Sequence, residues 1–173
     1  MTYALLTLGA DRPGIVAGIA GVLMQHGINI EDSQMSILRG HFAMVLILAA
    51  PDTVELTSLR RDLEDAGRRL GLEAVVVNEV AHAVAERSEP THAITVYGAD
   101  HPGIVYAVSS GLAEADVNVT GMTTRVVGED DPVYVMVLEV AAPDEIEPET
   151  VLAPVADEQS VEVSVRPIEA ATL

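Results

Sequence analysis

An eight-residue segment occurs twice in this chain. Residues 9–16 read Gly-Ala-Asp-Arg-Pro-Gly-Ile-Val and residues 98–105 read Gly-Ala-Asp-His-Pro-Gly-Ile-Val, so seven of the eight positions are identical at an offset of 89. The similarity continues beyond this segment, because Asn29 falls on Asn118 at the same offset. Internal repetition must be recognised before any fold is assigned. It predicts two copies of one structural unit.

The first half shows a clear order of predicted elements. A short apolar strand leads into the repeated segment, and apolar residues then recur at helical spacing from Ile15 until Gly27 ends the helix. Two further strands, a helix that opens at Pro51 and ends at Gly71, and a last strand complete the order β-α-β-β-α-β. The four strands are expected at 4–8, 28–38, 42–48 and 74–84, with 42–48 as a central strand covered on both faces.

The second half repeats this order. Strands are expected at 93–97, 119–127, 133–140 and 161–166, with a first helix over 104–115. The second helix, over 145–158, contains both Pro148 and Pro154, and we expect Pro154 to shorten or distort it. The polar residues 85–91 are typical of a linker. The predicted domains are therefore residues 1–86 and 91–173.

Two β-α-β-β-α-β units predict an α+β fold of two tandem ferredoxin-like sandwiches. Each unit would have an antiparallel four-stranded sheet with both helices on one face. Units of roughly 85 residues bury only a modest core. We therefore expect the halves to pack on each other or on a second chain.

The composition excludes several classes of function. The net charge is −18 and lysine is absent, so the surface repels nucleic-acid phosphates and direct nucleic-acid binding is not expected. The chain has no cysteine, which removes disulfides and thiolate catalysis. No long apolar run or basic leader occurs, so we expect a cytoplasmic protein that does not enter a membrane.

No arrangement of residues predicts catalysis. The five histidines lack metal-ligand spacing, and no glycine-rich phosphate loop follows a parallel β-α-β pattern. We therefore expect no catalytic residues, no metal and no cofactor. An enzyme that uses its acidic residues as acid and base is a third hypothesis, beside the two regulatory functions below.

The repeated segment and the matched asparagines are the candidate site. A Pro-Gly turn before a helix exposes backbone N–H groups that favour a carboxylate. The aspartates can accept from an ammonium group, and asparagine offers both a donor and an acceptor. The candidate ligand-binding residues are Asp11, Arg12, Pro13, Gly14, Ile15 and Asn29 in the first half, and Asp100, His101, Pro102, Gly103, Ile104 and Asn118 in the second.

Each of these residues also has a purely structural explanation. The aspartates can cap the first helix or the turn, the glycines can serve turn geometry, and the asparagines can cap a strand. His101, which replaces Arg12 in the second copy, is expected to be a surface residue rather than a base.

The repeated Asp-Arg/His-Pro-Gly-Ile-Val segment, followed at fixed spacing by asparagine, resembles the ACT domain over nearly the whole chain, twice. The resemblance implies a regulatory module that binds amino acids through this loop and this asparagine, often across an interface between two modules. Some amino-acid-binding members carry His and Asn in the loop. Here Gly9 and Gly98 stand in place of that His, and Asp11 and Asp100 in place of that Asn, which leaves the ligand open.

Together these features predict an amino-acid-sensing regulatory protein. The resemblance implies that its partner would be a transcription regulator of amino-acid (glycine) metabolism, so that the protein would control transcription. The alternative is a regulatory subunit that binds a metabolic enzyme. In either case we expect a homo-oligomer whose interface lies close to the ligand loops, because pairing supports two small cores.

Overall fold

The structure is a computed structural model that describes residues 1–81, 89–128 and 132–168. The chain divides into two units, Met1–Ala85 and Glu86–Leu173. Residues 85–88 of the predicted linker lie outside the described residues.

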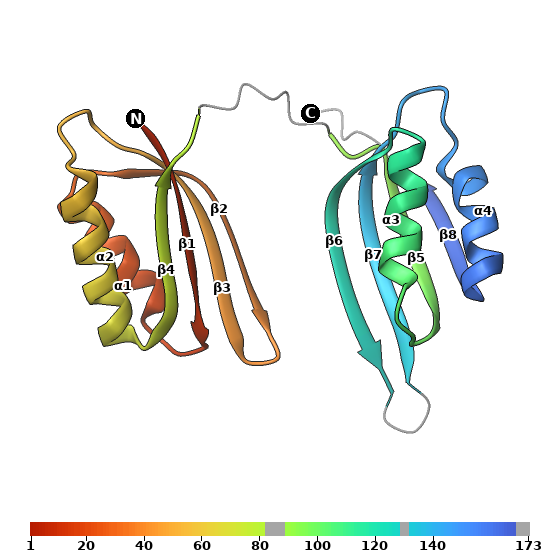
Figure 1. Cartoon of the computed structure of the whole chain (residues 1–173), viewed down its shortest axis with the longest axis horizontal. Helices are drawn as coiled ribbons and strands as arrows, with labels where there is room; N and C mark the ends of the chain where they lie inside the picture. Colours follow the sequence, from red (N-terminus) through yellow and green to blue (C-terminus); the bar gives the residue numbers. More distant parts are fainter. Residues whose placement is uncertain (82–88, 129–131, 169–173) are drawn as a thin grey trace. The chain divides into compact units, whose positions relative to one another are not determined.

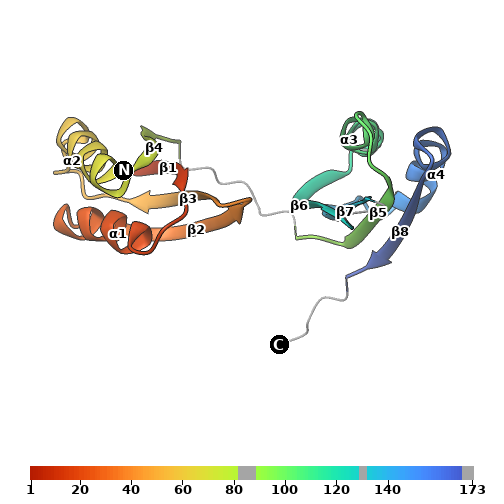
Figure 2. The ribbon, with the colours of Figure 1, turned by 90° about the horizontal axis from the view of Figure 1, so that it is seen from below.

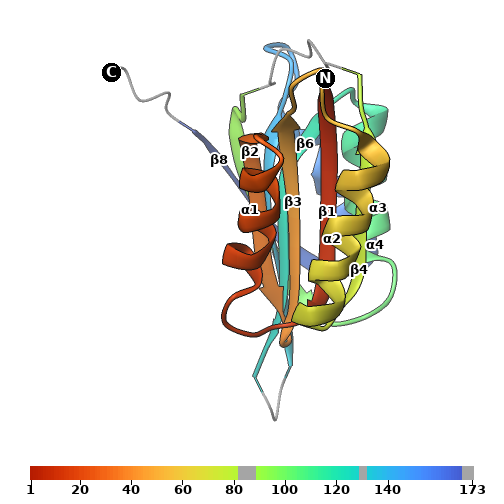
Figure 3. The same cartoon turned by 90° about the vertical axis from the view of Figure 1, so that its left-hand side faces the viewer.

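The first unit has the predicted order of elements. They are β1 (Thr2–Ala10), α1 (Ile15–Gln25), β2 (Asn29–Leu38), β3 (His41–Ala49), α2 (Leu56–Leu70) and β4 (Leu72–Glu79). The sheet has the order β2-β3-β1-β4, and every pair is antiparallel. Both helices lie on one face of this sheet (Figure 3).

The second unit repeats the first. Its elements are β5 (His92–Ala99), α3 (Ile104–Glu114), β6 (Asn118–Val127), β7 (Val133–Ala141), α4 (Pro148–Gln159) and β8 (Val161–Pro167). The sheet order is β6-β7-β5-β8, again antiparallel throughout (Figures 1 and 2). The predicted pair of tandem ferredoxin-like sandwiches is confirmed.

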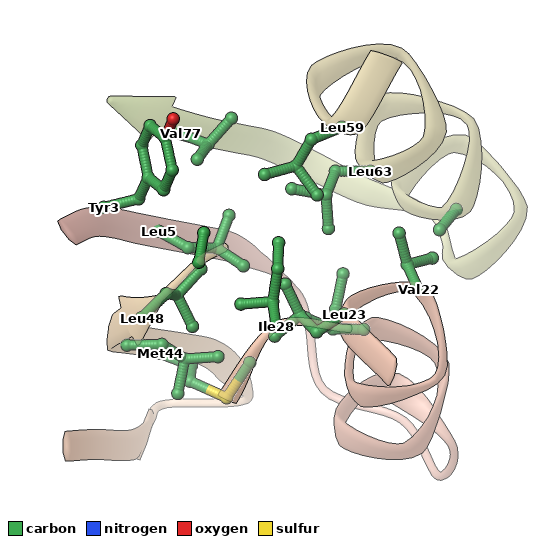
Figure 4. Packing of buried hydrophobic residues seen from close by; sticks show 14 of the residues in the cluster. Tyr3, Leu5, Val22, Leu23, Ile28, Met44, Leu48, Leu59, Leu63 and Val77 are labelled. Carbon is green, nitrogen blue, oxygen red and sulfur yellow. The ribbon is translucent and has the colours of Figure 1, made fainter. Parts of the chain in front are cut away.

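Each unit has its own hydrophobic core between the helices and the inner face of the sheet. In the first unit Leu5 of β1 and Leu48 of β3 meet Leu59 and Leu63 of α2, and all four side chains are fully buried (Figure 4). Their alternation along the strands follows from the two-residue period of a β-strand. A separate set around Val108 forms the core of the second unit.

Strand β3 is central in its sheet, but within its unit only one of its faces is covered. Val45, on the face away from the helices, is 43% exposed. The expectation of a strand covered on both faces is therefore not met inside the unit. A continuous apolar run shows that both faces are apolar, but it does not show what covers each one.

The open sheet face of the first unit is the face away from α1 and α2, and it is markedly apolar. Four of its large side chains are 42–47% exposed, namely Leu6, Leu8, Val45 and Val76. The corresponding face of the second unit is mixed, because Tyr97 there donates a hydrogen bond to the carboxylate of Glu162. This contact raises the pKa of Tyr97. The two units thus share a fold and differ in the surface of the sheet.

Helix α4 differs from its expected form. It runs unbroken through twelve residues, with Pro148 in its first turn and Pro154 inside it. Pro154 is exposed, so water can reach the carbonyl that loses its partner, and fully buried Leu152 holds the helix to the sheet. Tertiary packing therefore overrides the local cost of the proline.

The first prediction concerns the core of the first unit. Replacing Leu63 by alanine should lower the free energy of unfolding by about 2–5 kcal/mol, because the side chain is fully buried and leaves a cavity. Leu8→Ala is the control, since Leu8 is 42% exposed, and it should cost about 0.5 kcal/mol or less. Urea unfolding followed by NMR signals from each unit measures both. Equal losses would contradict the assigned core.

Candidate functional site

The repeated segment forms the turn between the first strand and the first helix of each unit. Gly14 precedes α1 with a φ of +96°, and Gly103 precedes α3 with a φ of +113°. Residues with side chains rarely adopt such angles, so the backbone requires glycine at both positions. The first helical hydrogen bonds run from Gly18 N–H to the Gly14 carbonyl (2.8 Å) and from Ala107 N–H to the Gly103 carbonyl (2.9 Å).

No side chain caps either helix. The structural explanation for Asp11 and Asp100 as helix caps therefore does not hold, because neither α1 nor α3 has a side-chain cap hydrogen bond. Both aspartates are exposed, and Asp11 is held through its backbone N–H, which donates to the Gly40 carbonyl at 2.8 Å. The first N–H groups of a helix have no partner within it. Both helix starts thus present donors and a partial positive charge.

The glycine that opens each repeated segment is fixed by close packing. A Cβ atom on Gly9 would lie 2.9 Å from Leu72 Cα, and one on Gly98 would lie 3.0 Å from Val161 Cγ1 and 3.3 Å from the Ser160 carbonyl. A histidine side chain therefore cannot occupy this position without moving β4 or β8. Any ligand contact must come from the rest of the loop.

Arg12 and His101 lie against the end of the second helix in their own units. The Arg12 guanidinium fills the space that a side chain on Gly71, the residue after α2, would occupy. His101 Nε2 lies 3.0 Å from the Gln159 carbonyl at the end of α4, and its Nδ1 lies 3.2 Å from the Pro102 carbonyl. The hydrogen bonds to Gln159 and Pro102, with a smaller effect of the Asp100 charge, raise the pKa of His101.

Gly71 and Gln159 were missed by the sequence reasoning. Neither carries a recognisable ligand motif, and their contact with the loop depends on folding across most of a unit. The sequence contained one indication of this contact. The offset of 89 also aligns Gly71, which follows α2, with Ser160, which follows α4.

The two asparagines lie far from the loops of their own units. Asn29 and Thr2 are both paired with Ala49, so Asn29 is level with the start of β1, whereas the loop follows Ala10 at its end. Eight strand steps separate these levels, or about 27 Å. Asn118 lies likewise beside Ala141, at the far end from Asp100. The structure therefore does not bring the loop and the asparagine of one unit together.

Asn29 borders a groove between α1 and β2. A hollow of about 420 Å³ is lined by Asn29 and by apolar side chains that include Met24 and Ile30. A second hollow of about 210 Å³ continues towards Met35 and Val16. Within the described parts of the chain, neither the Asn29 nor the Asn118 amide side chain makes a hydrogen bond, so neither caps a strand through its side chain.

A hydrogen bond between the His26 ring and the Asp62 carboxylate joins the end of α1 to α2. His26 Nε2 lies 3.0 Å from Asp62 Oδ2 on α2, and Arg61 Nε donates to the other oxygen of the same carboxylate at 3.1 Å. These two contacts lower the pKa of Asp62. The end of α1 is therefore attached to the second helix by a polar contact as well as by packing.

Comparison with protein families agrees with this geometry. Residues 3–77 and residues 92–153 each match the ACT domain. The chain belongs to the ACT domain family, with two ACT domains in tandem. This membership places it among small-molecule-binding regulatory proteins and points to a regulatory rather than a catalytic role.

Individual relatives cover one or both units. A UPF0237 protein of Methanopyrus kandleri is 44% identical over 89 residues, which are 50% of this chain and 99% of that protein. Phosphoserine phosphatase SerB2 of Mycobacterium tuberculosis is 30% identical in an alignment of 163 residues that covers 85% of this chain and 40% of the phosphatase. A crystal structure provisionally assigned as a glycine cleavage system transcriptional repressor has a TM-score of 0.71 at 14% identity, covering 98% of each chain. At that identity it shows a shared fold.

None of the described helices combines the length and apolar character needed to cross a membrane. In the same residues, no three His, Asp or Glu side chains are grouped as metal ligands.

The second prediction tests the glycine at the start of α1. Gly14→Ala should destabilise the first unit by about 1–3 kcal/mol, because alanine is strained at a φ of +96° although the space around it is open. Gly21→Ala is the matched control, since Gly21 lies inside α1 in equally open space and the change should stabilise by about 0.5–1 kcal/mol. Urea unfolding measures both. A neutral Gly14→Ala would show that the turn does not require its glycine.

Proposed function

We propose that this protein senses a small amino acid, or a related carboxylate, and passes the signal to a protein partner. The ligand carboxylate would meet the uncapped start of α1 or α3, and its ammonium group would meet Asp11 or Asp100. The observation that carries the proposal is the presence, in two ACT domains, of the same uncapped helix start behind a positive-φ glycine.

We propose that the asparagine beside the ligand comes from a second copy of the chain. One unit cannot offer both its loop and its asparagine to one small ligand, because about 27 Å separates them. In a homo-oligomer, the loop of one chain can meet the asparagine end of its partner. The groove beside Asn29 would then receive the apolar part of the ligand.

The partner we favour is a transcription regulator that controls glycine metabolism. The fold shared with the structure provisionally assigned as a glycine cleavage repressor supports this choice. A metabolic enzyme is the second candidate. It is favoured by the similarity of 85% of this chain to part of a protein named as a phosphoserine phosphatase. In both cases ligand and partner must affect each other's binding by the same factor.

The third prediction concerns ligand affinity. A thermal-shift screen of the amino acids should find a ligand, because one that binds only the folded state raises the melting temperature. Replacing Asn29 and Asn118 together by alanine should weaken its binding by about 1–3 kcal/mol in calorimetry. Asn78→Ala is the control, since Asn78 is an exposed asparagine on β4. If no amino acid binds the intact protein, the loops are structural turns.

The fourth prediction tests the composite site. A chain with Asp11→Ala and Asp100→Ala, and a chain with Asn29→Ala and Asn118→Ala, should each bind the ligand poorly. When the two chains are unfolded and refolded together, binding should return. In a dimer that contains one chain of each kind, half of the sites combine an intact loop from one chain with an intact asparagine from the other. Light scattering that shows only monomers, or mixing that restores nothing, would remove the second copy from the site.

The fifth prediction concerns the partner. With a net charge of −18, the protein alone should not retain duplex DNA at physiological salt. Co-purification should recover a DNA-binding regulator, whereas recovery of a biosynthetic enzyme would favour the second candidate. Ligand affinity that is unchanged by saturating partner would exclude coupling between the two.

A further inference from the structure

We infer that Arg12 and His101 are positioning residues, each holding its ligand loop against the end of the unit's second helix, and that the second loop alone is released when its positioning residue loses a proton. This inference goes beyond the proposed function, because it concerns the loops themselves and needs no ligand. It reassigns two side chains that the sequence suggested as ligand contacts.

The first unit uses a permanent cation. The Arg12 guanidinium lies over Gly71, which follows α2 in the left-handed conformation and has no side chain to compete for the space. The end of a helix carries a partial negative charge that favours a cation. Arginine stays protonated in proteins. The contact of the first loop therefore does not depend on pH near neutrality.

In the second unit, different residues make the contact between the loop and the end of the second helix. Ser160 stands where the first unit has Gly71, also in the left-handed conformation, with a φ of +52°. Its side chain takes space that the guanidinium fills in the first unit. The shorter His101 instead contacts the carbonyl of Gln159, the residue before Ser160, at 3.0 Å. Arginine is thus combined with glycine in one unit, and histidine with serine in the other.

The contacts of His101 favour the protonated ring. Both ring nitrogens face carbonyl oxygens, Nε2 that of Gln159 at 3.0 Å and Nδ1 that of Pro102 at 3.2 Å. A carbonyl only accepts, and a neutral imidazole has a single N–H. Only the imidazolium can make both hydrogen bonds. Of the charged groups around the ring, Asp100 on the same loop acts on it, and it also favours the cation.

The direction of the pH effect follows from these contacts. They raise the pKa of His101 above its ordinary value of 6.5. The stabilisation of the loop is therefore fully present below pH 6.5 and is lost as pH rises through the raised pKa of the folded protein. The first loop should show no matching change.

The test uses NMR on the full chain between about pH 5 and pH 9, a range that brackets histidine titration. The ring of His101 should titrate above 6.5, and the ¹⁵N order parameters of residues 100, 101 and 103 should fall along the same curve. Those of residues 11, 12 and 14 should stay constant. A His101 pKa at or below 6.5, or a second loop whose order does not change across the titration, would overturn the inference.

Variants separate positioning from a merely structural role. His101→Arg combined with Ser160→Gly copies the arrangement of the first unit, and it should keep the second loop ordered at every pH. Ser160→Gly alone should keep the pH dependence, and so should His92→Gln, which removes another histidine of the same unit. His101→Gln should leave the loop mobile at every pH. A pH dependence that survives in the double variant or in His101→Gln would assign the effect to another group.

Discussion

The first strand of each unit, which is paired on both sides, is the constraint on which the rest of the unit depends. Strand β1 is hydrogen-bonded along most of its length on both sides, to β3 and to β4. Its end is therefore fixed, and the loop that follows is held by the Gly40 carbonyl on one side and by the close approach of Gly9 to Leu72 on the other. A loop anchored in this way presents its backbone donors in a fixed arrangement, which would lower the ordering cost of the ligand binding that we propose.

The order of elements could be predicted from local signals, because strand alternation, helical spacing and stop residues such as Gly71 act within a few positions. Helix α4 was harder, since Leu152 packing keeps Pro154 inside a continuous helix. Only part of the candidate site could be predicted from the sequence. Repetition identified the loops, but the separation of Asn29 from its own loop depends on strand register. The contact between Arg12 and Gly71 depends on packing across most of a unit, and neither relation leaves a local pattern.

The two units show how a duplicated fold preserves one feature while another changes. The positive-φ glycine and the free helix start are kept in both, since the backbone path allows no substitute. The contact between the loop and the end of the second helix differs between the units. It joins Arg12 to Gly71 in the first unit, whereas in the second unit His101 lies beside Gln159 and Ser160. Such paired changes arise when two side chains share one small space. They allow two similar loops to differ in chemistry without a change of shape.

The open sheet face of the first unit has a consequence for the chain during its synthesis. All strand pairs of that unit lie within its own residues, so it can fold as soon as it has left the ribosome, before the second unit exists. At that moment Leu6, Leu8, Val45 and Val76 form an apolar surface on a half-made protein. Neighbouring nascent chains on one messenger carry the same surface. Residues 1–85 hold ten Asp and Glu against six Arg, a net charge of −4 out of −18, so this surface emerges before most of the charge that would repel neighbouring chains.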